Sequence, residues 1–197
     1  MGKCVMDEPR VLDEKTLASG AFLSLKSLLW RDGHGAEREW ESAVRENFSG
    51  AVLIIPLLRP SNRIAVIRQY RPPARKYVLE FPAGLVNPGE TPEAAAIREL
   101  REETGFVAKN IRLYPSAYTT PGMTDESVYP VVVEIDETLP ENQTPRTEFD
   151  PSEMIETLCV SVPDLPRFYR DQTEAGAAFD AKLAGFIIGL NFLRQSI

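Results

Sequence analysis

The pattern of apolar and polar positions begins with a region in which the two kinds of residue alternate. Ala21–Trp30 alternates in this way, a glycine-rich turn follows it, and Arg38–Asn47 returns with a similar pattern. Alternation with a period of two is typical of a half-buried strand, and the turn residues between the two runs favour a hairpin. We therefore predict a small antiparallel β unit over residues 1–48.

From Ser49 onward the apolar runs become longer and richer in β-branched residues. Gly50–Leu58 and Arg63–Arg71 flank a short turn and predict a second hairpin. The further elements that we expect are strands at Tyr77–Gly84, Arg112–Thr119, Val128–Ile135 and Met154–Val162, and helices at Thr91–Thr104 and Ala175–Gln195. Strands interleaved with helices indicate an α/β fold with a mixed sheet between helices, forming a main domain over residues 49–197.

The helix at Thr91–Thr104 has recognisable signals at both ends. Thr91 is of the type preferred at an N-cap, and Pro92 suits the first helical position. Gly105 suits the left-handed residue that follows many helices. These residues predict where the helix begins and ends.

Composition and charge narrow the class of protein. The 197 residues carry a net charge of −7 with a pI near 4.9, which argues against nucleic acids and membranes as partners. A small anionic substrate is compatible with this charge, because a bound metal ion can reverse the sign of a local site. Cys4 and Cys159 form no disulfide framework and no apolar leader opens the chain, so we expect a cytoplasmic protein.

Three glutamates gather in the last turns of the predicted helix, where they repel one another and face the negative end of the helix dipole. At 100° per residue, Glu99 and Glu103 lie about 40° apart, and Glu102 lies about 60° to the other side of Glu99. An apolar stripe that contains Ile97 and Leu100 adjoins them. Two of the carboxylates therefore border the expected buried face.

Acids beside a buried face are costly unless a cation lies between them. Mg²⁺ or Mn²⁺ fits this role, because both are hard ions that favour carboxylate oxygens and keep water and phosphate in their coordination shells. A solvated helix face is the alternative that the acidic residues alone leave open.

The residues around the acidic cluster match a known motif at every fixed position. Gly84, Glu90 and the run Arg98–Phe106 have the spacing of the Nudix box, so the chain resembles the Nudix hydrolase family. The resemblance implies a Nudix-type α/β/α sandwich and metal-dependent hydrolysis of a nucleoside diphosphate linked to another group. It also implies a set of metal ligands, namely the carbonyl of Ala83 with Glu99, Glu102 and Glu103.

Features outside the box resemble the ADP-ribose pyrophosphatases of this family. Pro121 lies sixteen residues after Gly105, and the segments Arg38–Arg45 and Arg68–Val86 also look like that subgroup. The resemblance implies Mg²⁺- or Mn²⁺-dependent hydrolysis of ADP-ribose, or a related ADP-sugar, to AMP and ribose 5-phosphate.

The same resemblance implies which residues bind this nucleotide-sugar substrate. Trp40 and Phe22 would sandwich the adenine, each from a different subunit of a homodimer with exchanged N-terminal strands. The full set is Phe22, Trp40, Glu41, Arg45, Arg71 and Leu85. Arginine suits a diphosphate because its fork can bond two oxygens together. The alternative for the two aromatic residues is that they belong to the core of the hairpin.

A general base is also needed, and relatives use a glutamate on the loop before the last sheet strand. That position maps to Glu153, with Glu156 as the second candidate, so the expected catalytic residues are Glu99, Glu103 and Glu153. Two other functions are compatible with the sequence: hydrolysis of another nucleotide sugar such as GDP-mannose, and non-catalytic nucleotide sensing. Every acid of the box is present, which favours an enzyme.

Overall fold

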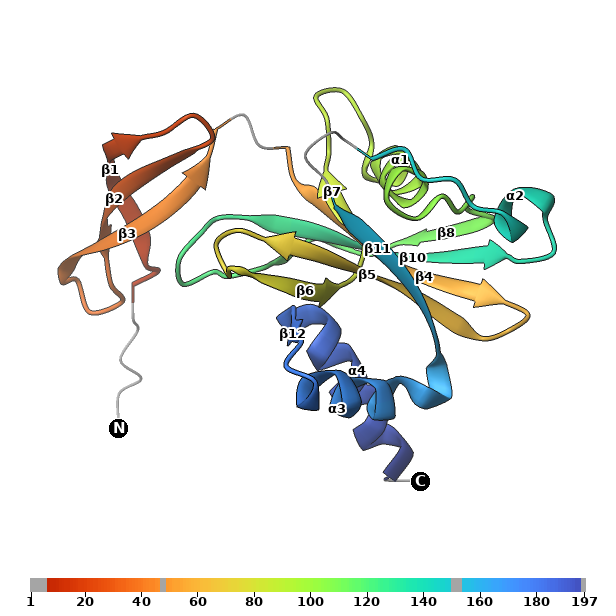
Figure 1. Cartoon of the computed structure of the whole chain (residues 1–197). Coiled ribbons are helices and arrows are strands. Elements are labelled where there is room, and N and C mark those ends of the chain that lie inside the picture. The colour runs from red at the N-terminus through yellow and green to blue at the C-terminus, as the bar shows by residue number, and fades with distance from the viewer. Residues whose placement is uncertain (1–6, 47–48, 150–153, 196–197) are drawn as a thin grey trace. The chain divides into compact units, whose positions relative to one another are not determined.

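The structure, a computed structural model, describes residues 7–46, 49–149 and 154–195 (Figure 1). These residues divide into two compact units. The first holds the described residues up to Gly50 together with Ser116–Val128, and the second holds Ala51–Pro115 and the described residues from Tyr129 onward. The first unit therefore contains a loop, Ser116–Val128, that the expected boundary after residue 48 did not assign to it.

The first unit is built on an antiparallel sheet in which β1 (Arg10–Ser19), β2 (Leu23–Arg31) and β3 (Glu37–Arg45) follow one another in order (Figure 1). β2 and β3 form the predicted hairpin, and the carboxylate of Asp32 closes its turn by accepting hydrogen bonds from two backbone N–H groups. β1 was not predicted, because all of its residues are exposed and its sequence lacks a strict alternation.

The second unit has a mixed sheet with helices on both faces, as predicted: α1 lies on one face, and α3 and α4 lie on the other (Figure 1). Its strands are β4 (Ala51–Arg59), β5 (Arg63–Arg71), β6 (Lys76–Glu80), β7 (Ala83–Leu85), β8 (Asn110–Leu113), β10 (Ser127–Asp136), β11 (Ile155–Ser161) and β12 (Ala178–Phe179). β10 begins in the first unit, where it pairs with β9 (Ala117–Tyr118). The helices are α1 (Pro92–Thr104), α2 (Pro140–Gln143), α3 (Leu165–Glu174) and α4 (Ala181–Gln195).

The strand order in this sheet is β12-β6-β5-β4-β10-β8, with β11 paired to β5 and β7 paired to β4. The β6–β12 pair is parallel, whereas β5 pairs antiparallel with β6 and with β11. None of the helices within residues 7–46, 49–149 and 154–195 combines the length and the apolar content that crossing a bilayer requires.

The core of the second unit lies between α1 and the sheet. Its members are Val52, Ile54, Leu58, Ala65, Val86, Ala95, Ala96, Leu100, Phe106, Val131, Val133 and Ile135. Cys159 of β11 is partly buried against this cluster. The apolar face of α1 is therefore fixed against the sheet.

The C-terminal region differs from the single helix that we expected at Ala175–Gln195. Gly176 adopts a φ of 85°, which interrupts the helical backbone, and the chain forms β12 before α4 begins at Ala181. The carboxylate of Asp180 accepts a hydrogen bond of 2.8 Å from the backbone N–H of Lys182 at the start of α4. Alanine-rich composition favours a helix, but pairing of β12 with β6 decided the structure here.

Candidate active site

The helix that carries the box glutamates, α1, is capped at both ends by the residues that the sequence predicted. The side-chain oxygen of Thr91 accepts a hydrogen bond of 3.2 Å from the N–H of Ala94. At the other end, Gly105 has a φ of 72° and donates its N–H to the carbonyl of Arg101 at 2.8 Å. These two caps define where α1 begins and ends.

The loop before α1 is tied to the helix through Arg98. The guanidinium donates to both carboxylate oxygens of Glu90, at 3.0 and 2.9 Å, and to the carbonyl of Leu85 at 3.0 Å. Glu90 also accepts the N–H of Asn87 at 3.0 Å. The hydrogen bonds from Arg98 and Asn87 lower the pKa of Glu90, so this carboxylate stays ionised and holds the loop.

Arg98 also lies between two of the box glutamates. Its Nη1 donates to Glu99 at 2.7 Å and to Glu102 at 3.0 Å. The hydrogen bonds to Glu90, Glu99 and Glu102 outweigh desolvation and raise the pKa of Arg98. The repulsion between the acids of this helix is therefore partly balanced within the box itself.

The glutamates expected as principal metal ligands lie against β7. Glu103 is 3% exposed, and its Oε2 accepts a hydrogen bond of 3.0 Å from the N–H of Ala83. The carboxylate of Glu99 packs on Gly84, where an added Cβ would lie 1.9 Å from the Glu99 Cδ. Only glycine allows this approach, so the box glycine brings the Glu99 carboxylate beside the backbone of Gly84.

The buried stripe of α1 differs from the one we expected in one residue. Ile97 is 46% exposed, whereas Ala95, Ala96 and Leu100 are fully buried. Glu103 is itself buried rather than at the border of the stripe. The buried face of α1 therefore includes Glu103 and excludes Ile97.

The oxygen atoms gathered at β7 and α1 suit a hard divalent cation. Glu99 and Glu103 offer carboxylates, and the carbonyl of Ala83 belongs to the same backbone segment that Glu103 binds. Mg²⁺ is commonly held by one or two carboxylates together with substrate phosphates and water. In the part of the chain that the structure describes, no group of three or more His, Cys, Asp and Glu side chains is arranged so that it could hold a metal ion. Two carboxylates and one carbonyl are thus compatible only with a site in which water and substrate oxygens complete the coordination of a cation.

Two of the expected substrate-binding residues lie in the same unit as the box. Arg71 ends β5 and donates to the carboxylate of Glu80, while Leu85 ends β7, is 43% exposed and binds Arg98 through its carbonyl. Glu80 did not enter the sequence prediction, and the signal for it was a charged residue within an otherwise apolar run, Val78–Phe81.

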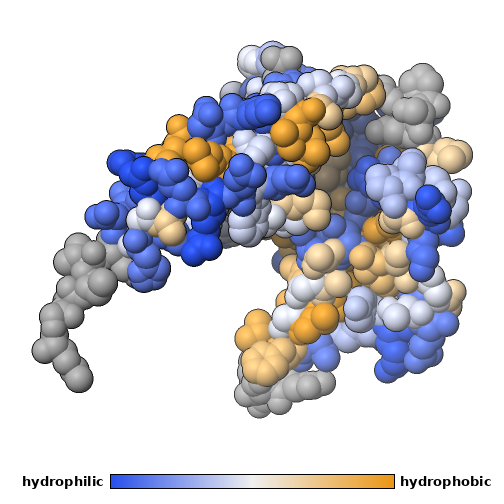
Figure 2. All heavy atoms as spheres, turned by 90° about the vertical axis from the view of Figure 1, so that its left-hand side faces the viewer, coloured by the Kyte–Doolittle hydropathy of each residue, from blue (hydrophilic) through white to orange (hydrophobic). Residues whose placement is uncertain are grey.

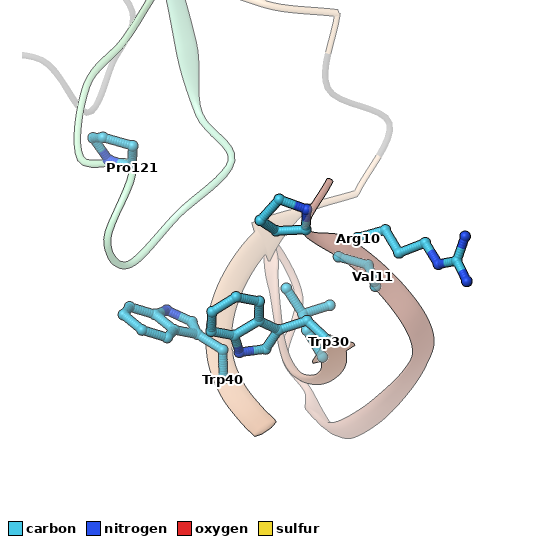
Figure 3. A pocket seen from close by; sticks show the side chains of 7 residues that line it. Arg10, Val11, Trp30, Trp40 and Pro121 are labelled. Atoms are coloured by element: carbon cyan, nitrogen blue, oxygen red, sulfur yellow. The ribbon is translucent and has the colours of Figure 1, made fainter. Parts of the chain in front are cut away.

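The other expected substrate-binding residues lie in the first unit. Trp40 lines a pocket of about 320 Å³ on the sheet, and its indole N–H donates to the carbonyl of Gly122 at 3.1 Å (Figure 3). The lining residues are Pro9, Arg10, Val11, Leu28, Trp30, Trp40 and Pro121. The structure thus brings Trp40 and Pro121, which the sequence singled out separately, to one pocket.

Trp30 is a residue of this pocket that the sequence prediction missed. Trp40 pairs with Leu28 across β2 and β3, and Trp30 lies two positions along β2, so the two indoles share one face of the sheet (Figure 3). The alternation of the β2 run, taken together with the hairpin register, could have identified it.

Phe22 does not line the pocket of its own chain. It is 75% exposed and precedes Leu23, which pairs with Arg45 at the end of β3 opposite the turn. Trp40 lies five positions away along β3, or about 17 Å for an extended strand. Phe22 and Trp40 of one chain therefore cannot face each other across a nucleobase, and neither of them is a buried core residue of the hairpin.

The remaining candidates are placed as follows. Glu41 is exposed opposite Ser27, and the Nε of Arg45 is buried without a hydrogen-bond partner among the described residues. Glu153 lies outside the described residues. Glu156, the second candidate for the general base, accepts a hydrogen bond of 3.2 Å from Arg68.

Comparisons with known proteins agree with this geometry. The profile of the NUDIX domain matches residues 48–181. An ADP-ribose pyrophosphatase of Saccharomyces cerevisiae is 34% identical over 182 residues, which cover 88% of this chain and 79% of that protein. An ADP-sugar pyrophosphatase of Mus musculus is 30% identical over 188 residues, which cover 91% of this chain and 86% of that protein.

In three dimensions the chain resembles a crystal structure of an ADP compounds hydrolase, with a TM-score of 0.71 and 20% identity over 97% of both chains. The fold is therefore that of this structure, and the chain belongs to the Nudix family of hydrolases. Within the family, an ADP-ribose pyrophosphatase of Bacillus subtilis is also similar, with 32% identity over 180 residues, or 88% of this chain and 90% of that protein.

Proposed function

We propose that this protein hydrolyses the diphosphate linkage of ADP-ribose, giving AMP and ribose 5-phosphate. The observation that carries the proposal is the pair of glutamates on α1, Glu99 and Glu103, held against the backbone of β7 by a complete Nudix box. The names of the similar proteins from yeast, mouse and Bacillus supply the substrate class, since all three are pyrophosphatases of ADP-ribose or ADP-sugars.

In this proposal the chain holds Mg²⁺ or Mn²⁺ with Glu99, Glu103 and the carbonyl of Ala83, and Glu102 assists. Such a cation, when bound, neutralises diphosphate charge and lowers the pKa of a water molecule. Arg98 keeps the loop and Glu99 in place through its hydrogen bonds. The box thus positions the oxygen atoms before substrate arrives, which lowers the cost of reorganisation during reaction.

Hydrolysis requires that water adds to one phosphorus while the bond from that phosphorus to the bridging oxygen breaks. A carboxylate must take the proton of the attacking water. We assign this role to Glu153, with Glu156 as the second candidate. The ion pair of Glu156 with Arg68 supports this order, because it already engages one of the two Glu156 carboxylate oxygens.

We further propose that Trp40 stacks on the adenine and that the second aromatic surface, Phe22, comes from another copy of the chain in a homodimer. The separation of Trp40 from Phe22 within one chain supports an intermolecular pair. Exposed apolar side chains on the strands of the first unit, among them Val11, Leu17 and Leu25, support an interface there. Figure 2 shows such hydrophobic patches at the surface, interrupted by hydrophilic residues.

The substrate is tested by incubating the purified protein with ADP-ribose, other ADP-sugars and GDP-mannose, with and without Mg²⁺, and ranking the substrates by kcat/KM. We expect AMP from ADP-ribose and a requirement for the divalent cation. Running the reaction in ¹⁸O-labelled water identifies the phosphorus that is attacked. Preference for GDP-mannose, or no turnover above the metal-free control, would refute the proposal.

The homodimer is tested by sedimentation velocity on the wild type and on Phe22→Ala. We expect a dimer of the wild type, and we expect Phe22→Ala to raise KM for ADP-ribose because one stacking surface is lost, by about tenfold. A wild type that stays monomeric at the concentrations used for kinetics would exclude the shared adenine site.

A further inference from the structure

The guanidinium of Arg71 is held on one edge by a carboxylate that the Nudix box does not contain. Its Nε donates to Oε1 of Glu80 at 2.8 Å, and its Nη2 donates to Oε2 at 3.0 Å. Arg71 pairs with Lys76 across β5 and β6, and Glu80 lies four positions further along β6, so the two side chains share one face of the sheet. The pair uses two of the five N–H donors of the guanidinium, which leaves the opposite edge for a ligand.

The two partners of this ion pair differ in their exposure to solvent. The side chain of Glu80 is 11% exposed and that of Arg71 is 42% exposed. Burial raises the pKa of Glu80, and the hydrogen bond from Arg71 acts against this shift. Glu80 is therefore a buried anion whose charge is matched by the more exposed arginine, an arrangement that fixes the arginine in one orientation.

The segment that carries Glu80 also holds the metal-site glutamate. Ala83, three residues after Glu80, donates its N–H to Glu103. Between them, Phe81 is 1% exposed and packs edge-to-face on Phe186 of α4, with 5.4 Å between the ring centroids. The four residues Glu80–Ala83 thus contact both Arg71 and Glu103.

The C-terminal elements hold this stretch from its other side. β12 pairs in parallel with β6, and the N–H of Asp180 donates to the carbonyl of Leu79 at 2.9 Å. The carboxylate of Asp180 is engaged by Lys182, whose Nζ lies 2.8 Å away. Lys182 therefore offsets the negative charge that Asp180 would otherwise add near Glu80, and Arg71 is the cation that hydrogen-bonds Glu80.

We propose that Glu80 is a positioning residue that presents the outer edge of Arg71 to the diphosphate of the substrate, with β12 and α4 bracing the strand that carries it. This inference rests on the proposed function in that Arg71 is taken to bind the diphosphate. Glu80 itself touches no substrate, so its loss acts through Arg71.

The test is a double-mutant cycle with Glu80→Gln, Arg71→Ala and the double variant. The matched control is Glu137→Gln, because Glu137 pairs with Arg63 at side-chain exposures of 14% and 42%, close to those of the Glu80–Arg71 pair. ADP binding in the presence of Mg²⁺ is measured by calorimetry, ADP-ribose turnover is measured in parallel, and thermal melting reports on folding.

We expect Glu80→Gln to weaken ADP binding and to raise KM for ADP-ribose by about tenfold or more, the size expected for loss of a charge-assisted hydrogen bond. The double variant should bind ADP no more weakly than Arg71→Ala, because both changes remove the same function. Glu137→Gln should leave both constants unchanged.

Two results would overturn the inference. The first is that Glu80→Gln folds and keeps the wild-type KM and ADP affinity, whereas Arg71→Ala binds ADP more weakly. The second is that the wild type does not bind ADP. Because the cycle is read on ADP binding without turnover, a wild type that binds ADP but does not hydrolyse ADP-ribose would refute the proposed function alone.

Discussion

At the scale of single residues, Arg98 explains how the helix tolerates its acids. Each pair of like-charged side chains three or four positions apart destabilises a helix by about 0.2–0.5 kcal/mol, and α1 has three such acids within five positions. Arg98 bonds Glu99 and Glu102, while Glu103 is satisfied by the N–H of Ala83. The acids are therefore held in place before any cation binds.

Glu103→Gln tests the role of the buried carboxylate. We expect kcat for ADP-ribose to fall by at least about 100-fold, because an amide is a poor ligand for a hard cation and does not offset its charge. Circular dichroism should show a folded protein. Glu93→Gln, an exposed glutamate in the first turn of the same helix, is the control that should keep wild-type activity.

Gly84→Ala tests the close approach of the Glu99 carboxylate to the backbone. The new Cβ would lie 1.9 Å from the Cδ of Glu99, so the carboxylate must move. A displacement of about 1 Å in a catalytic group can cost about 100-fold in rate, and we expect a loss of this order in kcat/KM. Gly185→Ala in α4, where the Cβ meets no atom within 4 Å, should be neutral. Full activity of Gly84→Ala would show that Glu99 need not occupy this position.

At the scale of elements, α1 is placed by contacts at its C-terminal end as well as by its apolar face. The backbone of Glu148 donates to the carbonyl of Glu102 at 2.9 Å, and Arg146 lies directly against Gly105. The loop after α2 therefore packs on the turn that carries the box glutamates, which the helix signals alone did not indicate.

Gly105→Ala tests this contact. A Cβ at position 105 would lie 2.4 Å from the backbone nitrogen of Arg146, and its φ of 72° is unfavourable for alanine. We expect the free energy of unfolding to fall by more than about 1 kcal/mol, which chemical denaturation would measure. Gly89→Ala is the control, because its φ is 81° but its Cβ meets no atom within 4 Å. Equal losses in the two variants would mean that the contact with the loop contributes nothing.

At the scale of the whole molecule, stability depends on pH through carboxylates that are paired in the folded state and have a lower pKa there than in the unfolded chain. The hydroxyl of Thr138 and the ammonium of Lys109 lower the pKa of Asp136 to about 2. The bonds to Ser61 and Arg63 lower the pKa of Glu137 against the effect of burial. A carboxyl group with a lowered pKa stabilises the fold above its unfolded pKa, and this contribution disappears as the pH falls through the folded value.

We therefore expect the urea midpoint to decline as the pH falls from about 5 toward 2. Asp136→Asn should lower the midpoint at pH 7 and make the decline shallower, because one of the paired carboxylates is gone. Glu80 has the opposite effect, because burial raises its pKa and the folded state therefore binds the proton of this carboxyl more tightly than the unfolded chain does. A pH profile identical to that of the wild type would show that Asp136 makes no contribution to acid stability.

The sequence predicted most of the fold through local signals. Thr91 and Gly105 predicted the bounds of α1 because caps act through their nearest backbone groups. Alternation and turn residues predicted the hairpin of β2 and β3. β1 and β12 were missed, because an exposed strand and a two-residue strand depend on pairing rather than on a periodic pattern. α3 was missed although Leu165, Phe168 and Tyr169 have the spacing of one helix face.

The helix, its acids and the box spacing that places the chain in the Nudix family could be predicted without the structure, because each depends on residues close together along the chain. Contacts between distant segments settle which oxygens face β7, that Ile97 is exposed, and that Glu80 binds Arg71. Those outcomes depend on the register of β5 with β6 and on the packing of α1 against the sheet, which join residues far apart in the sequence.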